Sequence, residues 1–338
     1  MTKYTYYLHH TYPRTQLKTK QNQTMTYSKY SSSFINNTTQ IAIILLCYWF
    51  RFSCAEGINA VHSVPMFTME ELSSGSHDTE LETILTTTGI LSVQVHEIDD
   101  VRLDALQDFC FEEDNSFFQE EVWLQDGHTK RSTWTSTRTG MYNAIPIPTP
   151  DYIEDDNMLD MYHTTAMEEL RDHVTKSSNL FQKALDRILQ KHITSDASLL
   201  MTNEYPQENY DSITDVISKS TNLEHFHSYT TTTTESHTSS CDDHAIWTPH
   251  TDPSLFLAFV PGHNCGVDEP DDSLVIVPDK EGAPLTAQFQ PGTIVFMLGS
   301  GVEGRLRLPS TLHLKATVHK IQMRPGQSRL WYGMSKFY

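Results

Sequence analysis

The chain has 338 residues, is 38% hydrophobic, and carries 24 Lys+Arg against 43 Asp+Glu, a formal net charge of −19. This length allows one large domain or two small ones, and the hydrophobic content is enough for a sizeable core. The acidic balance argues against nucleic acid or an anionic membrane as a partner, since both favour a basic face. Five cysteines in a chain of this length are too few for a disulfide-rich scaffold.

The first 55 residues differ in composition from the rest. They contain six Lys/Arg and no Asp or Glu, which leaves 18 basic and 43 acidic residues, a net charge of −25, in 56–338. The run 41–50 is apolar but too short to span a bilayer, which takes roughly 20 residues. Ser53 and Ala55 place small residues before a cut at Glu56.

These features predict a secretory signal peptide, 1–55, and a mature protein in the endoplasmic reticulum lumen or outside the cell. Met25 would start a leader of ordinary length, so residues 1–24 are expected to be an untranslated extension. A buried strand and an uncleaved membrane anchor remain alternatives. After cleavage we expect no stable membrane insertion. Cys110, Cys241 and Cys265 would remain, and their odd number leaves at least one thiol free or paired between molecules.

Residues 56–221 are predicted to form a helix-rich N-terminal half. Apolar residues at helical spacing indicate two long helices, in 151–173 and 180–191. Shorter helices are expected over 69–85 and 101–110, and a strand is expected over 86–95. The alternating, Thr-rich segment 127–139 is expected to be strand or loop.

From residue 222 to 338 the pattern becomes that of a β structure. Short strands separated by Pro-Gly turns are expected over 223–229, 255–260, 273–278, 287–289, 293–297, 315–321 and 328–334. A Thr/Ser-rich loop over 230–243 and a solvated, acidic hairpin tip over 268–272 interrupt them. The predicted fold class is therefore α+β, with a double-stranded β-helix, or jelly roll, supported by N-terminal helices.

His250-Thr-Asp252 is the one His-x-Asp/Glu triplet in the chain, and it comes directly before an apolar strand. Residues two apart in extended backbone point to the same side, so both side chains could bind one metal ion. His313 and His319 are the candidates for a third ligand from a later strand, and His319 is preferred because it lies in a β-branched strand that His313 precedes. Two imidazoles and one carboxylate form the facial triad of non-haem Fe(II) oxygenases. A structural or solvent-exposed trio, with Arg329 in a surface ion pair, is the alternative.

The segments 249–255, 291–299 and 316–321, with Arg329, resemble the Fe(II)/2-oxoglutarate-dependent dioxygenases, and most closely the isopenicillin-N-synthase-like subgroup. The resemblance covers 222–338. It implies that His250, Asp252 and His319 bind iron, and that Arg329 binds the distal carboxylate of 2-oxoglutarate. It also suggests that Tyr229 contacts this co-substrate. Trp331 departs from the family pattern, which has Ser there, so co-substrate binding is altered or another hydroxyl substitutes.

The resemblance implies an oxygenase that uses Fe(II), 2-oxoglutarate and O₂ to hydroxylate or desaturate a small molecule. Two alternatives stay open: a catalytically inactive jelly-roll binding module, and a metalloenzyme of this fold with another co-substrate or none. His225 and His227 share one strand face and are expected to line the co-substrate pocket or to pack. Cys241 and Cys265 flank the triplet and could form a disulfide, or Cys241 could simply lie in a loop.

Overall fold

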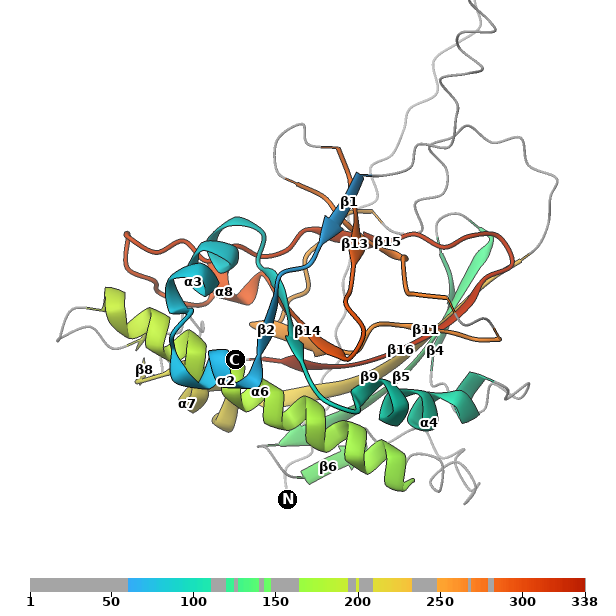
Figure 1. Ribbon diagram of the computed structural model, residues 1–338, viewed down its shortest axis with the longest axis horizontal. Helices are drawn as coiled ribbons and strands as arrows, with labels where there is room; N and C mark the ends of the chain where they lie inside the picture. Colours follow the sequence, from blue (N-terminus) through green and yellow to red (C-terminus); the bar gives the residue numbers. More distant parts are fainter. Residues whose placement is uncertain are drawn as a thin grey trace, which may run out of the picture. The chain divides into compact units, whose positions relative to one another are not determined.

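The computed structural model describes residues 60–110, 120–124, 127–139, 143–146, 164–193, 199–200, 209–232, 248–266, 269–278 and 283–337 (Figure 1). All of them belong to the unit formed by 56–338. The predicted leader, 1–55, lies outside the described residues. Within those ranges, no helix combines the length and apolar character that crossing a membrane would require.

The main element is a ten-stranded sheet that takes strands from both sides of residue 222. Eight of them, in spatial order, are β2 (Met66–Thr68), β3 (Ile90–Gln94), β14 (Thr293–Leu298), β10 (Phe256–Phe259), β16 (Ser328–Lys336), β9 (Thr221–Thr231), β5 (Thr129–Thr139) and β4 (Glu120–Trp123). In addition, β11 (His263–Asn264) pairs with β16, and β6 (Asn143–Pro146) pairs with β5. All pairs are antiparallel except that β2 runs parallel to β3.

A four-stranded sheet packs on one face of the large sheet. Its order is β1 (Ala60–Ser63), β13 (Leu285–Gln288), β12 (Leu274–Ile276) and β15 (His319–Ile321). Inward-facing side chains of both sheets share one apolar cluster, in which Leu274 and Ile276 of the small sheet meet Phe259 and Met297 of the large sheet. Successive side chains of a strand point to opposite faces of the sheet. The alternate residues of β10 and β14 therefore belong to a second cluster, on the opposite face.

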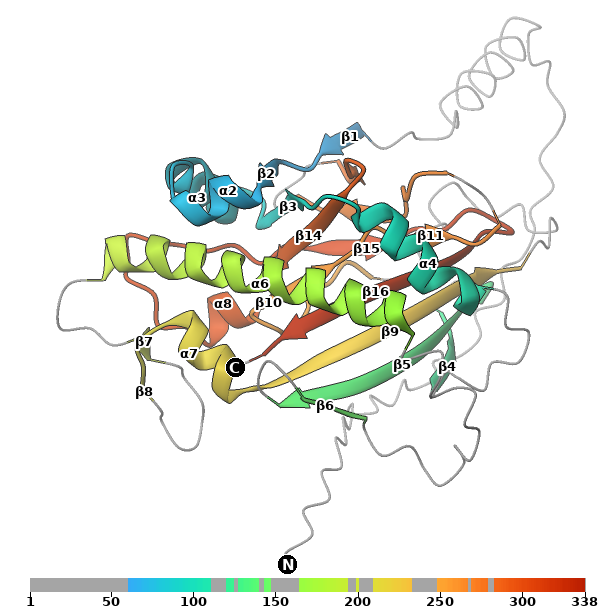
Figure 2. The same cartoon turned by 60° about the horizontal axis from the view of Figure 1, so that its bottom comes forward.

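Helices cover the other face of the large sheet, where α6 (Thr165–His192) runs across the strands (Figure 2). The sequence predicted two helices here, but 165–192 form a single helix, and 151–163 lie outside the described residues. The polar residues Ser177 and Ser178, which lie between the two predicted helices, are buried within the single helix, and Ser178 Oγ donates a hydrogen bond to the Val174 carbonyl at 2.7 Å. No glycine or proline interrupts this segment.

Two other N-terminal predictions are corrected in detail. The helix expected over 69–85 is two helices, α2 (Met69–Ser74) and α3 (Asp78–Thr87), because Gly75 adopts a left-handed conformation (φ 74°) that ends α2. Thr86 and Thr87 therefore belong to α3, and the following strand, β3, starts only at Ile90. The helix expected over 101–110 is present as α4 (Ile98–Cys110).

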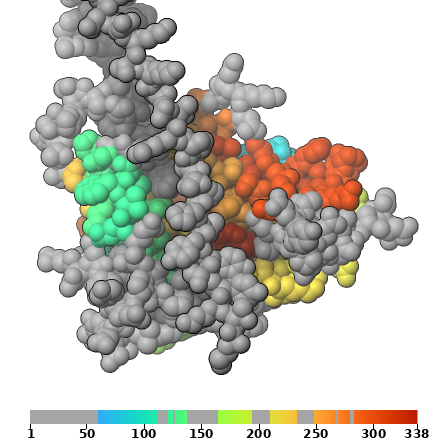
Figure 3. Space-filling model, turned by 180° about the vertical axis from the view of Figure 1, so that it is seen from behind, coloured from blue at the N-terminus to red at the C-terminus, as the bar shows by residue number. Residues whose placement is uncertain are grey.

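The remaining elements lie near the C-terminus of the chain (Figure 2). They are β7 (Leu199–Leu200), β8 (Asn209–Tyr210), α7 (Ile213–Lys219) and α8 (Gly301–Gly304). Seen from behind, the yellow surface of the α7 region lies below the orange and red surface of the last segments (Figure 3). A hydrogen bond of 3.0 Å from Ser220 Oγ to the Phe337 carbonyl joins the two regions. The α+β class predicted from the sequence is confirmed.

Candidate metal centre and its cavity

The structure brings together His250, Asp252 and His319, the three residues that the sequence predicted as metal ligands. His250 and His319 are paired through an antiparallel bridge, in which each backbone N–H donates to the other residue's carbonyl, at 3.0 and 2.9 Å. His319 opens β15 of the small sheet, and Asp252 follows His250 in the loop that leads to β10. Segments far apart in sequence are thus fixed by backbone bonds rather than by the side chains themselves.

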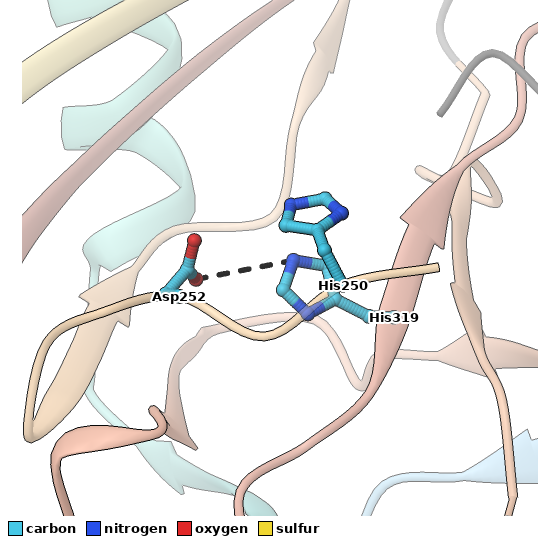
Figure 4. A group of neighbouring side chains, drawn as sticks. All are labelled: His250, Asp252 and His319. Carbon is cyan, nitrogen blue, oxygen red and sulfur yellow. Dashed lines mark ion pairs between the residues drawn. The ribbon is translucent and has the colours of Figure 1, made fainter. Parts of the chain in front are cut away.

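The three side chains face one another (Figure 4). One ligand atom from each lies within 4.8 Å of the others, and His319 Nε2 is 3.9 Å from Asp252 Oδ2. Among the described residues this is the one cluster of three or more His, Cys, Asp or Glu that could hold a metal ion.

The tautomers of both histidines suit a metal. His250 Nδ1 lies 3.1 Å from the Thr248 carbonyl, and His319 Nδ1 lies 3.1 Å from the Thr317 carbonyl. A carbonyl oxygen can only accept a hydrogen bond, so each Nδ1 carries the proton and each Nε2 keeps its lone pair. This is how second-sphere carbonyls orient metal-binding histidines.

Two hydrogen bonds from Ser300 fix the backbone of Asp252. Its backbone carbonyl accepts hydrogen bonds from the Ser300 N–H at 2.7 Å and from Ser300 Oγ at 3.1 Å. Its side-chain Oδ2 is buried and has no hydrogen-bond donor. A buried carboxylate oxygen without a donor is costly, and a bound cation would remove that cost. The donor set therefore fits a divalent metal with two nitrogen ligands and one oxygen ligand.

The centre opens into a cavity of about 110 Å³ between the two sheets. Part of its lining comes from two rows of residues that face one another across β5, β9 and β16. The first row is Arg131, Tyr229 and Arg329, and the second is Thr133, His227 and Trp331. Of these six, all but Thr133 line the cavity, and Thr133 Oγ1 lies 3.0 Å from His227 Nδ1.

Arg329 is fully buried at one end of the first row. Its Nη2 donates to Asp271 Oδ2 at 2.6 Å, and the two side chains are 1% and 0% exposed. Among the described residues, its buried Nε and Nη1 have no hydrogen-bond partner. The predicted alternative of a surface ion pair is therefore wrong, and these two nitrogens carry three N–H groups that could donate to an anion.

Asp271 corrects the prediction of a solvated tip over 268–272. Besides Arg329, it accepts hydrogen bonds from the Gly262 N–H at 2.7 Å and from Ser273 Oγ at 2.6 Å. Burial alone would raise the pKa of this carboxyl, but the charge of Arg329 and these hydrogen bonds hold the pKa below its ordinary value. Asp272, in contrast, is half exposed and pairs with the exposed Arg324.

Histidines 225 and 227 are neutral at physiological pH. Burial lowers the pKa of His225 to about 4, and burial lowers the pKa of His227 well below its ordinary value. The positive charges of Arg131 and Arg329 add to the effect on His227. Both histidines line the cavity, as one of the two predicted readings had it, so they contribute polarity but no charge.

Trp331 extends away from the arginine row. Its indole stacks on His227, with ring centroids 5.2 Å apart, and reaches over Gly333, where a Cβ would lie 2.9 Å from Trp331 Cη2. Gly333 is two residues further from Arg329 on the same face of β16. The Trp331 indole therefore extends along β16 away from Arg329. It provides no hydroxyl that could donate to an anion.

Two site residues were not anticipated. Arg131 lies in the segment 127–139, which was expected to be strand or loop and is β5, and only its pairing with β9 reveals its place. The second is Asp271, which the sequence placed in a solvent-exposed hairpin tip.

His313, the other candidate for the third ligand, lines a separate pocket with Glu303 and Arg307. The metal cluster contains His319 instead.

Cys265 forms a disulfide with Cys110, which joins the end of α4 to the residue after β11. Pairing of Cys265 with Cys241 is therefore excluded, and Cys241 itself lies outside the described residues. The backbone N–H of Cys265 donates to the Ser328 carbonyl at 2.9 Å, so the disulfide lies directly beside the strand that carries Arg329.

No protein-family model and no curated protein matches the chain. Solved structures do. The complex of the Arabidopsis thaliana dioxygenase for auxin oxidation 1 with 2-oxoglutarate matches with a TM-score of 0.51 and 12% identity over 81% of this chain and 92% of that chain. The complex of JOX2 with 2OG, Fe and JA matches with 0.51 and 12% over 82% and 75%. A full-length Neurospora crassa protein in complex with alpha-KG matches with 0.51 and 10% over 81% and 84%. At these identities the likeness concerns the fold, and the chain has the fold of 2-oxoglutarate-dependent oxygenases, as the motifs suggested.

Proposed function

We propose that this chain is an Fe(II)- and 2-oxoglutarate-dependent oxygenase that hydroxylates or desaturates a small-molecule substrate. One observation carries the proposal. A His-Asp-His cluster and a buried arginine, two of whose nitrogens have no hydrogen-bond partner among the described residues, line the same cavity. The cluster would bind a metal ion, and the arginine would bind the distal carboxylate of a short dicarboxylic acid.

Each residue then has a role. His250, Asp252 and His319 would hold Fe(II), which supplies the activation of O₂ in centres with this facial triad. Three protein ligands leave coordination positions open for the co-substrate and O₂. Arg329 would bind the distal carboxylate through charge-assisted N–H bonds, which are stronger in a desolvated cavity than in water. The apolar side chains around it, among them Leu257 and Phe259, would exclude water.

The comparisons support this assignment indirectly. The matching structures are complexes with 2-oxoglutarate or alpha-KG, and one of them also contains Fe. In keeping with them, we propose that the two packed sheets are the double-stranded β-helix of this class.

Succinate formation tests the function. Protein loaded with Fe(II) should convert 2-oxoglutarate to succinate, and His250→Ala, Asp252→Ala or His319→Ala should abolish it. Metal binding without any turnover would favour the inactive binding module. Oxidation of a substrate that does not depend on 2-oxoglutarate would favour another co-substrate. Full turnover by Asp252→Ala would contradict the proposal.

We also propose that the protein matures in the secretory pathway. The disulfide between Cys110 and Cys265 supports this, because disulfides persist mainly in oxidising compartments. Expression of the full chain with its own leader in a secreting cell, followed by N-terminal sequencing, should give a mature chain that starts at Glu56. Retention of residues before Glu56 would overturn the predicted cut.

A further inference from the structure

The cavity contains a second arginine on the same face of the sheet as Arg329. Arg131 of β5 is the register partner of Tyr229 in β9, and Tyr229 is the register partner of Arg329 in β16. Three residues directly opposite one another on neighbouring strands point to the same side. Both arginines line the cavity, and Tyr229 lies between them in strand order.

The charges of both arginines act on the space above Tyr229. Burial raises the pKa of the Tyr229 hydroxyl, while Arg131 and Arg329 both lower it. The ring of Tyr229 also lies under the guanidinium of Arg329, with Cζ 5.9 Å from the ring centroid. Arg131 and Arg329 thus lie on the strands on either side of Tyr229, and the charges of both act on its hydroxyl.

Cations outnumber anions among the described charged side chains that line the cavity. Among the described residues that line it, the charged side chains are Arg131, Arg329 and Asp252. Asp252 belongs to the metal cluster, and the histidines of β9 are neutral. Asp271 forms an ion pair with Arg329. Arg131 and Arg329 are therefore the described lining residues that would attract the anionic end of a ligand.

We propose that Arg131 is a second co-substrate-binding residue, whose guanidinium binds the distal carboxylate of 2-oxoglutarate together with Arg329. This inference rests on the proposed function and adds a residue to it. Arg131 would supply the polar contact that Trp331 cannot make. It also implies strong discrimination between dicarboxylic and monocarboxylic 2-oxo acids, because only the dicarboxylic acid brings an anion to the end of the cavity where both cations act.

Binding to metal-loaded protein tests the role of Arg131 without turnover. The protein is loaded with Mn(II), and the Kd values of 2-oxoglutarate and of 2-oxopentanoate, which has the same chain length without the distal carboxylate, are measured by calorimetry. Arg131→Gln should raise the Kd of 2-oxoglutarate by about tenfold to a hundredfold. It should leave the Kd of 2-oxopentanoate and of Mn(II) nearly unchanged.

Lys130→Gln is the matched control, since it removes the same charge from the neighbouring position of β5. Lys130 points to the opposite face, where it pairs with Glu121 at 2.6 Å. It should leave all Kd values unchanged. If Arg131→Gln does not fold, Arg131→Lys keeps the charge but not the guanidinium, and should weaken 2-oxoglutarate binding while leaving 2-oxopentanoate binding intact.

The outcomes separate the two proposals. An unchanged 2-oxoglutarate Kd in Arg131→Gln, with a large increase in Arg329→Gln, would overturn the role of Arg131 and leave the proposed function intact. An equal loss of both 2-oxo acids in Arg131→Gln would also overturn it, because the effect would not involve the distal carboxylate. Absence of 2-oxoglutarate binding in the wild type would contradict the proposed function itself.

Discussion

The guanidinium of Arg329 lies against the backbone of Gly262, so closely that a Cβ on Gly262 would come within 2.1 Å of Arg329 Nε. Gly262 also donates its N–H to Asp271, the ion-pair partner of the same arginine. The turn after β10 thus holds both members of the pair, and the bare backbone of Gly262 is a condition for the position of Arg329.

Gly262→Ala should therefore displace the guanidinium. We expect the Kd of 2-oxoglutarate to rise by about tenfold or more, because one charge-assisted hydrogen bond contributes about 1.5–3 kcal/mol. The metal affinity should not change, since neither Gly262 nor Arg329 belongs to the ligand cluster. Calorimetry on the Mn(II)-loaded protein measures both values. Gly304→Ala, where an added Cβ meets no atom within 4 Å, is the control. Equal 2-oxoglutarate affinity in Gly262→Ala and wild type would show that the contact has no such role.

Asp271→Asn should destabilise the fold, because it leaves the buried Arg329 without a countercharge. Removing one partner of a buried ion pair costs about 3–5 kcal/mol. The free energy of unfolding in urea measures it, and Asp272→Asn, at the half-exposed neighbour that pairs with Arg324, should change it by less than about 1 kcal/mol. A loss no larger than that of the control would contradict this account.

The contribution of Asp271 should also depend on pH. Its pKa in the folded protein lies below that of the unfolded chain, so its stabilising effect is complete above the unfolded value of about 3.9 and declines as the pH falls further. The difference in unfolding free energy between wild type and Asp271→Asn should therefore be constant from about pH 5 to about pH 7 and shrink at lower pH. A difference that shrinks near neutral pH would point to another group.

Arg171 fixes α6 on the back of the sheet. Its Nε donates to Glu224 Oε1 at 2.7 Å, Tyr332 Oη donates to the same oxygen at 2.9 Å, and Glu224 is fully buried in β9. Arg171→Met should lower the unfolding free energy by about 3–5 kcal/mol, because it removes a cationic partner of a buried carboxylate. Lys176→Met, at an exposed position of the same helix, should have little effect. Equal stability of the two variants in urea would rule out a structural role for the buried pair.

The Cys110–Cys265 disulfide closes a loop of 155 residues in sequence separation. By the chain-entropy relation, such a crosslink contributes about 5 kcal/mol. Cys110→Ser should therefore lower the urea midpoint strongly, and so should reduction of the wild type, whereas reductant should not affect the variant further. A thiol titration of the unfolded, non-reduced mature protein should find one free thiol, that of Cys241. Three free thiols would contradict the pairing.

The sequence was sufficient to predict the strands and the metal cluster. Strands alternate with period two, and His250-Thr-Asp252 needs only extended backbone to point both side chains the same way. His319 was preferred for its β-branched segment, and the family resemblance added Arg329 ten residues later. Most strands after residue 222 lie near their expected ranges, but the strand expected over 315–321 forms only at His319–Ile321. The role of the cluster as a metal site stays a prediction.

The arginine row could not be predicted because it depends on non-local strand register. Arg131 meets Tyr229 only through the pairing of β5 with β9, whose register no local pattern fixes. The prediction for Asp271 was wrong for a related reason, since an acidic run is usually solvated and its partner Arg329 lies 58 residues later. The continuity of α6 was missed because the apolar spacing was followed in two separate segments, while the intervening Ser177 and Ser178 are polar but buried.

The central claim is that His250, Asp252 and His319 hold Fe(II) while Arg329 binds 2-oxoglutarate in the same cavity. The visible absorption of the anaerobic protein with Fe(II) and 2-oxoglutarate tests it most directly. The account predicts a weak metal-to-ligand charge-transfer band that requires both additions, persists in Asp272→Ala and disappears in Asp252→Ala. No band from folded wild type saturated with both components, or the same band from Asp252→Ala, would contradict it.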